Sequence, residues 1–143
     1  MKNSKEILSS VLKTAQMGQV GIRSLLDTTM QPALRSALES QLREYDAIET
    51  EAHAIASQRG WELRELDPAV RFLSHRMTRM KLVGSNRDSR IADMMIQGNT
   101  KGMTELMKTV KENRTAAREY CEIAKEIADF EEKNIEKLKA YLK

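Results

Sequence analysis

Residues 8–25 have the sequence LSSVLKTAQMGQVGIRSL, in which small and apolar residues recur at alternating steps of three and four. This spacing places them on one stripe of an α-helix. The stripe consists of Leu8, Val11, Ala15, Gly18, Ile22 and Leu25. The stretch therefore predicts a long helix, over about residues 4–29, that buries one face against neighbouring helices. Asn3 is expected to cap its first turn.

Residues 32–59 continue the same spacing and predict a second long helix. Pro32 suits the first turn of a helix and disfavours helix at the residue before it, while Gly60 suits the C-terminal end. Each of the two helices would be roughly 40 Å long at ~1.5 Å per residue. Because the connection between them is short, they must pack antiparallel and side by side.

Residues 61–85 have a different pattern from the long helices on either side. Asp67 suits a helix cap, Pro68 suits the first helical position, and a short amphipathic stripe follows before Gly84. We predict a crossover helix over residues 68–83. It would carry the chain from one end of the bundle to the other before the third long helix begins.

The remainder of the chain predicts two more long helices, over residues 86–112 and 115–142. An unbroken helix over this region would be roughly 85 Å long, more than a compact domain of this size can cover. A tight turn is therefore expected where the apolar stripe lapses after Val110. We expect an all-α protein, a four-helix bundle that forms a single domain over residues 1–143.

The composition agrees with helices and limits the class of protein. The chain has two prolines, six glycines and few aromatic residues, which favours helix over sheet. Its net charge of +3 is too small to nominate a partner by itself. Cys121 has no second cysteine to pair with, and no segment approaches the roughly 20 apolar residues of a membrane span. We therefore predict a cytoplasmic protein without a membrane span.

Two segments resemble ferritin-like proteins. Residues 124–136, AKEIADFEEKNIE, resemble a ferritin-like fourth helix, and residues 91–103, IADMMIQGNTKGM, are similar to a third-helix segment of a small bacterial group of ferritin-like proteins. A long crossover between the second and third long helices is also typical of these bundles. The resemblance implies a ferritin-like up-down bundle over nearly the whole chain.

The chain departs from the ligand set of di-iron ferritin-like proteins. That set needs an inward glutamate on each of two helices and a Glu-x-x-His pair on each of the others. Here Asn134 or Ile135 stands where the last histidine is expected, and Glu49 and Glu51 precede His53 at spacings of four and two. We therefore predict a bundle without metal or other cofactor.

A polar cluster is expected at mid-bundle, around Glu131 on an inward stripe. Its predicted members are Gln19, Gln41, Glu44, Tyr45, Glu131 and Asn134. A buried charge is costly unless it is partnered, so we expect the Glu131 carboxylate to bond to Gln19, Gln41 or Tyr45. The alternative is a degenerate metal site at Glu131, assisted by Glu44 or Glu51.

Four glycines lie near the centres of predicted helices, at Gly18, Gly21, Gly98 and Gly102. Each costs about 0.8 to 1 kcal/mol relative to alanine in a helix interior, so their presence needs a reason. We expect them to allow close approach of neighbouring helices. The alternative is a cavity for a small ligand at mid-bundle.

These patterns predict a non-enzymatic, metal-free bundle that acts as an interaction or structural module, as a homodimer or with another protein. No phosphate-binding loop, nucleophile elbow or histidine-containing catalytic constellation is present in the sequence. One alternative is a metal-binding or redox protein of the same fold. Another is weak binding of nucleic acid or an anionic surface through the basic residues Arg64, Arg71, Arg76, Arg79, Lys81, Arg87 and Arg90. Nucleic acid is disfavoured because no aromatic residues interleave with them.

Overall fold

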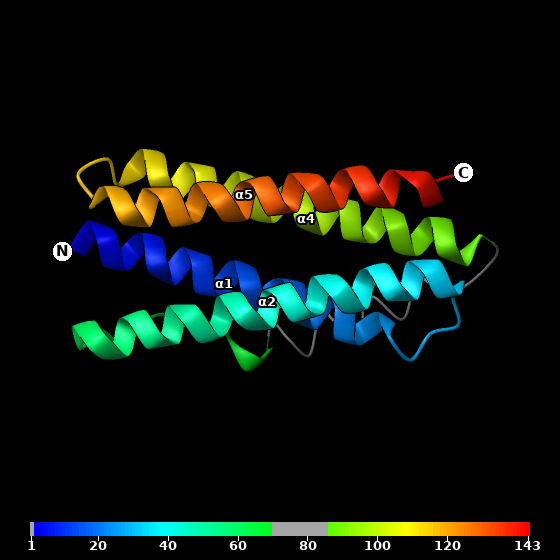
Figure 1. Cartoon of the computed structure of the whole chain (residues 1–143), viewed down its shortest axis with the longest axis horizontal. Helices are drawn as coiled ribbons and strands as arrows, with labels where there is room; N and C mark the ends of the chain where they lie inside the picture. The colour runs from blue at the N-terminus through cyan, green and yellow to red at the C-terminus, as the bar shows by residue number, and fades with distance from the viewer. Residues whose placement is uncertain (1, 70–85) are drawn as a thin grey trace.

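The computed structural model of the chain describes residues 2–69 and 86–143. Within these ranges the protein is all-helical, as predicted, and has no strand. The helices are α1 (Lys2–Leu25), α2 (Pro32–Arg59), α4 (Arg87–Glu112), α5 (Arg118–Leu138) and the short 3-10 helix η1 (Lys139–Tyr141) (Figure 1). None of the described helices is both long and apolar enough to cross a membrane.

The four long helices lie side by side in two antiparallel pairs, α1 with α2 and α4 with α5 (Figure 1). The α2 helix ends beside the start of α1, whereas α4 begins at the opposite end of the bundle, so α2 and α4 run in the same direction. Helix α1 also packs against α4 and, less extensively, against α5. The bundle therefore contains a connection that spans its length between α2 and α4.

The predicted crossover helix over 68–83 lies almost wholly outside the described residues. Its expected start is described: residues 68 and 69 are helical, and the Asp67 carboxylate accepts a hydrogen bond of 2.8 Å from the Ala69 backbone N–H. The chain before this point is held against α1. The Leu66 backbone N–H donates to the side-chain oxygen of Gln16 at 2.8 Å.

The bounds of α2 coincide with the predicted ones. Pro32 occupies its first position, and Gly60 follows its end with a left-handed φ of 69°. In this conformation the Gly60 N–H reaches the carbonyls of Ala56 and Ser57. A glycine adopts this φ without steric cost, which is why it ends the helix here.

Helix α1 differs from its predicted range at both ends. It begins at Lys2, so Asn3 lies inside the helix, and the predicted cap is wrong. It ends at Leu25 rather than near 29. In the connection that follows, the Arg35 guanidinium donates to the carbonyls of Leu26 and Thr28, at 2.6 and 2.8 Å, and satisfies these two backbone acceptors.

The last helix is shorter than the predicted range of 115–142. It begins at Arg118, after the backbone N–H of Ala117 donates to the Ser4 hydroxyl at 3.0 Å. It ends at Leu138, and the 3-10 helix that follows leaves Leu142 exposed. Leu142, the last residue of the predicted range, therefore lies outside α5 and outside the core.

The apolar core consists of two clusters, one toward each end of the bundle. One cluster is centred on Ile22, Leu38 and Ile91, and the other on Leu8, Leu106 and Tyr120. Buried polar side chains occur between and beside these clusters, on all four long helices. They include Gln16, Gln19, Gln41, Asn99, Glu131 and Asn134. This arrangement places buried polar groups at mid-bundle.

Candidate functional site

Three buried polar side chains from three helices meet at mid-bundle, and we call them the polar centre: Tyr45 of α2, Asn99 of α4 and Glu131 of α5. The Tyr45 hydroxyl oxygen lies 2.5 Å from Oε1 of Glu131 and 3.1 Å from Oδ1 of Asn99. The exposed fractions are 1% for Tyr45, 2% for Asn99 and 1% for Glu131. Phe130 packs edge-on against the Tyr45 ring and holds it in place, with ring centroids 5.3 Å apart.

The polar centre has two hydrogen-bonding states, because a tyrosine hydroxyl has only one proton to donate. When Glu131 is ionised, Tyr45 donates to its carboxylate, and the Asn99 amide must turn its NH2 group toward the hydroxyl oxygen. When Glu131 is protonated, it donates to Tyr45, which in turn donates to the Asn99 oxygen. The protonation state of Glu131 therefore decides whether the oxygen or the NH2 group of the Asn99 amide is left without a bond to Tyr45.

Burial raises the pKa of Glu131 from 4.5 to about 7, although the hydrogen bond from Tyr45 acts in the opposite direction. Burial, together with the neighbouring Glu131, raises the pKa of Tyr45 far above its ordinary value. Tyr45 is therefore a neutral hydroxyl at any physiological pH. Glu131 changes its charge close to neutrality.

The polar centre opens into a cavity of about 650 Å³, which we call the central cavity and which lies mainly between α1 and α4. Part of its wall is apolar, formed by Met17, Val20, Met94 and Met95. Three basic and three acidic side chains also line it, namely Lys13, Arg64, Lys101, Glu6, Glu105 and Glu112. These six charges balance in number, which leaves the carboxylate of Glu131 as the surplus charge.

All four mid-helix glycines line the central cavity, but they do so in two ways. A Cβ at Gly18 would lie 2.4 Å from the Tyr45 ring, and one at Gly102 would lie 3.2 Å from Thr14. These two glycines permit close packing, as expected. A Cβ at Gly21 or Gly98 would meet no described atom within 4 Å, so the predicted close contact is absent there. The alternative prediction, a cavity, fits these two positions.

The remaining predicted members of the polar cluster lie in different surroundings. Gln19 does not reach Glu131: its amide donates to Asp46 at 2.8 Å and to Glu49 at 3.1 Å, between α1 and α2. Gln41 is buried, and neither atom of its amide has a hydrogen-bond partner among the described residues. Asn134 is buried near the hydroxyl of Tyr45, where it lowers the pKa of that group.

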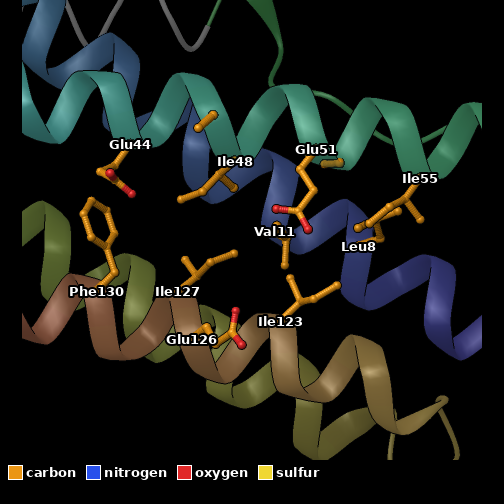
Figure 2. A pocket seen from close by; sticks show the side chains of 12 residues that line it. Leu8, Val11, Glu44, Ile48, Glu51, Ile55, Ile123, Glu126, Ile127 and Phe130 are labelled. Atoms are coloured by element: carbon orange, nitrogen blue, oxygen red, sulfur yellow. The ribbon is translucent and has the colours of Figure 1, made fainter.

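Glu44 lies away from the polar centre, on the opposite seam of the bundle. Figure 2 shows it beside a groove of about 220 Å³ between α2 and α5, which we call the acidic groove. The apolar lining includes Ile48, Ile55, Ile123, Ile127 and Phe130, and the acidic side chains are Glu44, Glu51 and Glu126. Glu44 and Glu51 are exposed, so neither can assist Glu131 in holding a metal ion.

The donor set at the polar centre does not fit a di-iron site, which needs several carboxylates and imidazoles. It offers one carboxylate, one phenol and amides. Among residues 2–69 and 86–143 no group of three or more His, Cys, Asp or Glu side chains is arranged to hold a metal ion. His53 is half exposed and contacts Glu65 at 3.4 Å, and His75 lies outside these ranges.

The sequence prediction did not include Asn99. It named Gly98, one position earlier, but Gly98 is exposed and Asn99 is buried. Helical spacing does not distinguish the two positions. Met95 and Gly102 are separated by one step of three and one step of four residues, whether the residue between them is Gly98 or Asn99. The same ambiguity occurs in α5, where Asn134 is buried and Ile135 is only partly buried.

A comparison of the chain with models of protein families, with curated proteins and with solved structures finds no match in any of the three. The likeness to ferritin-like bundles therefore stays a prediction from the sequence. What the site can bind has to follow from its own geometry.

Proposed function

We propose that this chain is a metal-free helical bundle, of ferritin-like layout, that binds a small organic molecule in the central cavity. The observation that carries the proposal is the Asn99 amide. It is only 2% exposed, it lines the cavity, and its Nδ2 has no hydrogen-bond partner among the described residues. Buried polar groups in folded proteins are nearly always partnered, and a bound ligand would supply the missing partner.

Two further features support a ligand. The volume of about 650 Å³ is within the range of small-molecule sites. Gly21 and Gly98 each cost about 0.5 to 1 kcal/mol relative to alanine and relieve no contact with a described atom. Space for a ligand accounts for both glycines, whereas close packing does not.

The proposal is tested by a fragment screen observed through labelled methionine methyl groups. Fragments that enter the cavity are expected to shift the methyl signals of Met94 and Met95. The Gly21→Leu variant, which fills part of the cavity, should abolish these shifts. A matched control, Ala47→Leu, narrows the acidic groove instead and should leave them unchanged. If no fragment at millimolar concentration shifts either methyl group of the folded wild-type protein, the proposal is overturned.

The acidic groove favours a second candidate function, the interaction module predicted from the sequence. Its apolar floor and its three glutamates complement a basic amphipathic helix of a partner protein. A synthetic helical peptide with leucines on one face and lysines on the other should bind, and its affinity should fall as salt is added. The double variant Glu44→Lys, Glu51→Lys should not bind. Equal binding to this variant would remove the candidate.

Binding of nucleic acid, of an anionic surface or of a metal ion stays a prediction from the sequence. The basic residues of the crossover lie mostly outside the described ranges, and of those described Arg64 is paired with Glu6. Binding of nucleic acid or an anionic surface through this region would show a steep dependence on salt. If Glu131 binds a metal ion, the Glu131→Ala variant should lose the bound metal and keep the helicity of the wild type.

A further inference from the structure

We infer that the central cavity selects an organic cation, a primary or secondary aliphatic amine attached to a small apolar group, with its ammonium group held by Glu131 and Asn99. The inference rests on the proposed function, since it names the class of ligand for the same cavity. It is carried by the donors and acceptors of the polar centre and by the charges that line the cavity.

The first step concerns the carboxylate of Glu131. Its Oε1 accepts the Tyr45 proton, while its Oε2 lies 3.6 Å from the place a Cβ would take at Gly102, on the cavity wall. No ion pair joins Glu131 to a basic group of the described residues. A buried carboxylate that lacks a cation is unfavourable, and an ammonium group of a ligand would compensate it.

The second step concerns the amide of Asn99. With Glu131 ionised, its NH2 group turns toward the Tyr45 hydroxyl, as the single proton of that hydroxyl requires. The amide oxygen then occupies the position of Nδ2, which has no hydrogen-bond partner among the described residues. The polar centre thus presents two acceptors, Oε2 of Glu131 and the Asn99 oxygen. An ammonium group carries two or three donors and matches this set.

The walls around these acceptors are compatible with a cation attached to an apolar group. Lys13, Lys101 and Arg64 line the cavity and would repel a cation, but the three glutamates Glu6, Glu105 and Glu112 offset their charges. The apolar wall of Met17, Val20, Met94 and Met95 suits a hydrocarbon body. A ligand carboxylate would instead meet the charge of Glu131. Amines are therefore favoured over both acids and alcohols.

The test compares three ligands of nearly equal shape: cyclohexylmethylamine, cyclohexylmethanol and cyclohexanecarboxylate. Their dissociation constants are measured by calorimetry and by methionine methyl shifts at pH 8. The amine is expected to bind at least about tenfold more tightly than the alcohol, which is the scale of one charge-assisted hydrogen bond. The acid is expected to bind least. Affinity for the amine should fall at pH 6, where Glu131 holds a proton.

The variant Glu131→Gln separates charge from shape, because a glutamine can still accept a hydrogen bond from Tyr45. It should reduce amine binding about tenfold and leave alcohol binding unchanged, with helicity checked by circular dichroism. Ala47→Leu, in the acidic groove, is the matched control: it leaves the polar centre intact and should retain the preference for the amine. Equal binding of amine and alcohol would overturn the inference while the proposed function stands. Absence of binding by all three, in a screen that finds other ligands, would also overturn the inference alone.

Discussion

Two seams between the described helices, one between α1 and α4 and one between α2 and α5, differ in the side chains that line them. The seam between α1 and α4 is opened by missing side chains, since Gly21 and Gly98 border the central cavity. The seam between α2 and α5 is instead bordered on both sides by large side chains, such as Ile48 and Ile127, which face each other across the acidic groove in Figure 2.

The two seams also place their carboxylates differently. Glu131 is buried in the first seam, and its pKa is raised to about 7. Glu44 is exposed at the edge of the second. A carboxylate in the interior can respond to a ligand or to pH, whereas one at an exposed edge serves mainly to attract charge from outside. Under the proposed functions, the first seam would bind a small molecule and the second would bind a partner helix.

The largest expected effect is a loss of stability with rising pH that depends on Glu131. Its pKa in the folded protein, about 7, lies above the ordinary value of 4.5, so the folded state keeps a proton that the unfolded chain has released. Stability is then lost as pH rises through this window, by about 2 to 3 kcal/mol between pH 5 and 8. Urea unfolding of wild type and Glu131→Gln across this range measures the difference.

Glu44→Gln is the matched control for this prediction, because it makes the same chemical change at the exposed edge of the acidic groove. Its stability should run parallel to that of the wild type at every pH. If Glu131→Gln also runs parallel, the carboxylate is not desolvated, and the contrast between the seams fails.

The next effect concerns the glycine that touches the polar centre. Alanine at Gly18 would place its Cβ 2.4 Å from the buried ring of Tyr45, which must then move away from Glu131. We expect Gly18→Ala to destabilise the protein by about 1 to 2 kcal/mol, since overpacking outweighs the gain in helix propensity. Gly102→Ala, with a contact of 3.2 Å to Thr14, should be nearly neutral. Stabilisation by Gly18→Ala would contradict the close contact.

The bounds of α2 followed directly from the sequence, because Pro32 and Gly60 act on their own backbone and need no neighbour. The ends of α1 did not. After its C-terminal end at Leu25, the carbonyls of Leu26 and Thr28 accept hydrogen bonds from Arg35 of the next helix, which the spacing within α1 does not show. A residue that acts on its own backbone can be recognised in the sequence. A hydrogen bond between two helices depends on how the helices pack, which the sequence of either helix does not show.

The candidate site was predictable only in part for a related reason. Tyr45 and Glu131 stand on inward stripes near the middle of their helices, and Tyr45 was one of three predicted partners of Glu131, with Gln19 and Gln41. Asn99 was missed because a buried position at 98 or at 99 satisfies the same helical spacing. The choice between them depends on how α4 is rotated about its axis. Neighbouring helices set that rotation, and the spacing within α4 does not encode it.

A smaller effect is expected in the acidic groove. Ile123 is only partly buried and faces the gap between α2 and α5. Its truncation in Ile123→Ala should cost about 1 kcal/mol, below the roughly 2 to 5 kcal/mol typical of a fully buried isoleucine. Thermal and urea unfolding measure this loss. A cost above about 3 kcal/mol would mean that this seam is closed in solution.

The smallest effect is a gain of stability at the open glycines. A Cβ at Gly21 or Gly98 meets no described atom within 4 Å, so alanine there costs no packing and restricts the unfolded chain. Each substitution should stabilise the protein by about 0.5 to 1 kcal/mol while it narrows the central cavity. If the cavity binds a ligand, the same variants should weaken binding as they raise stability. Such opposite changes would indicate that these glycines are retained for the ligand, whereas unchanged binding would indicate that the space beside them is not used.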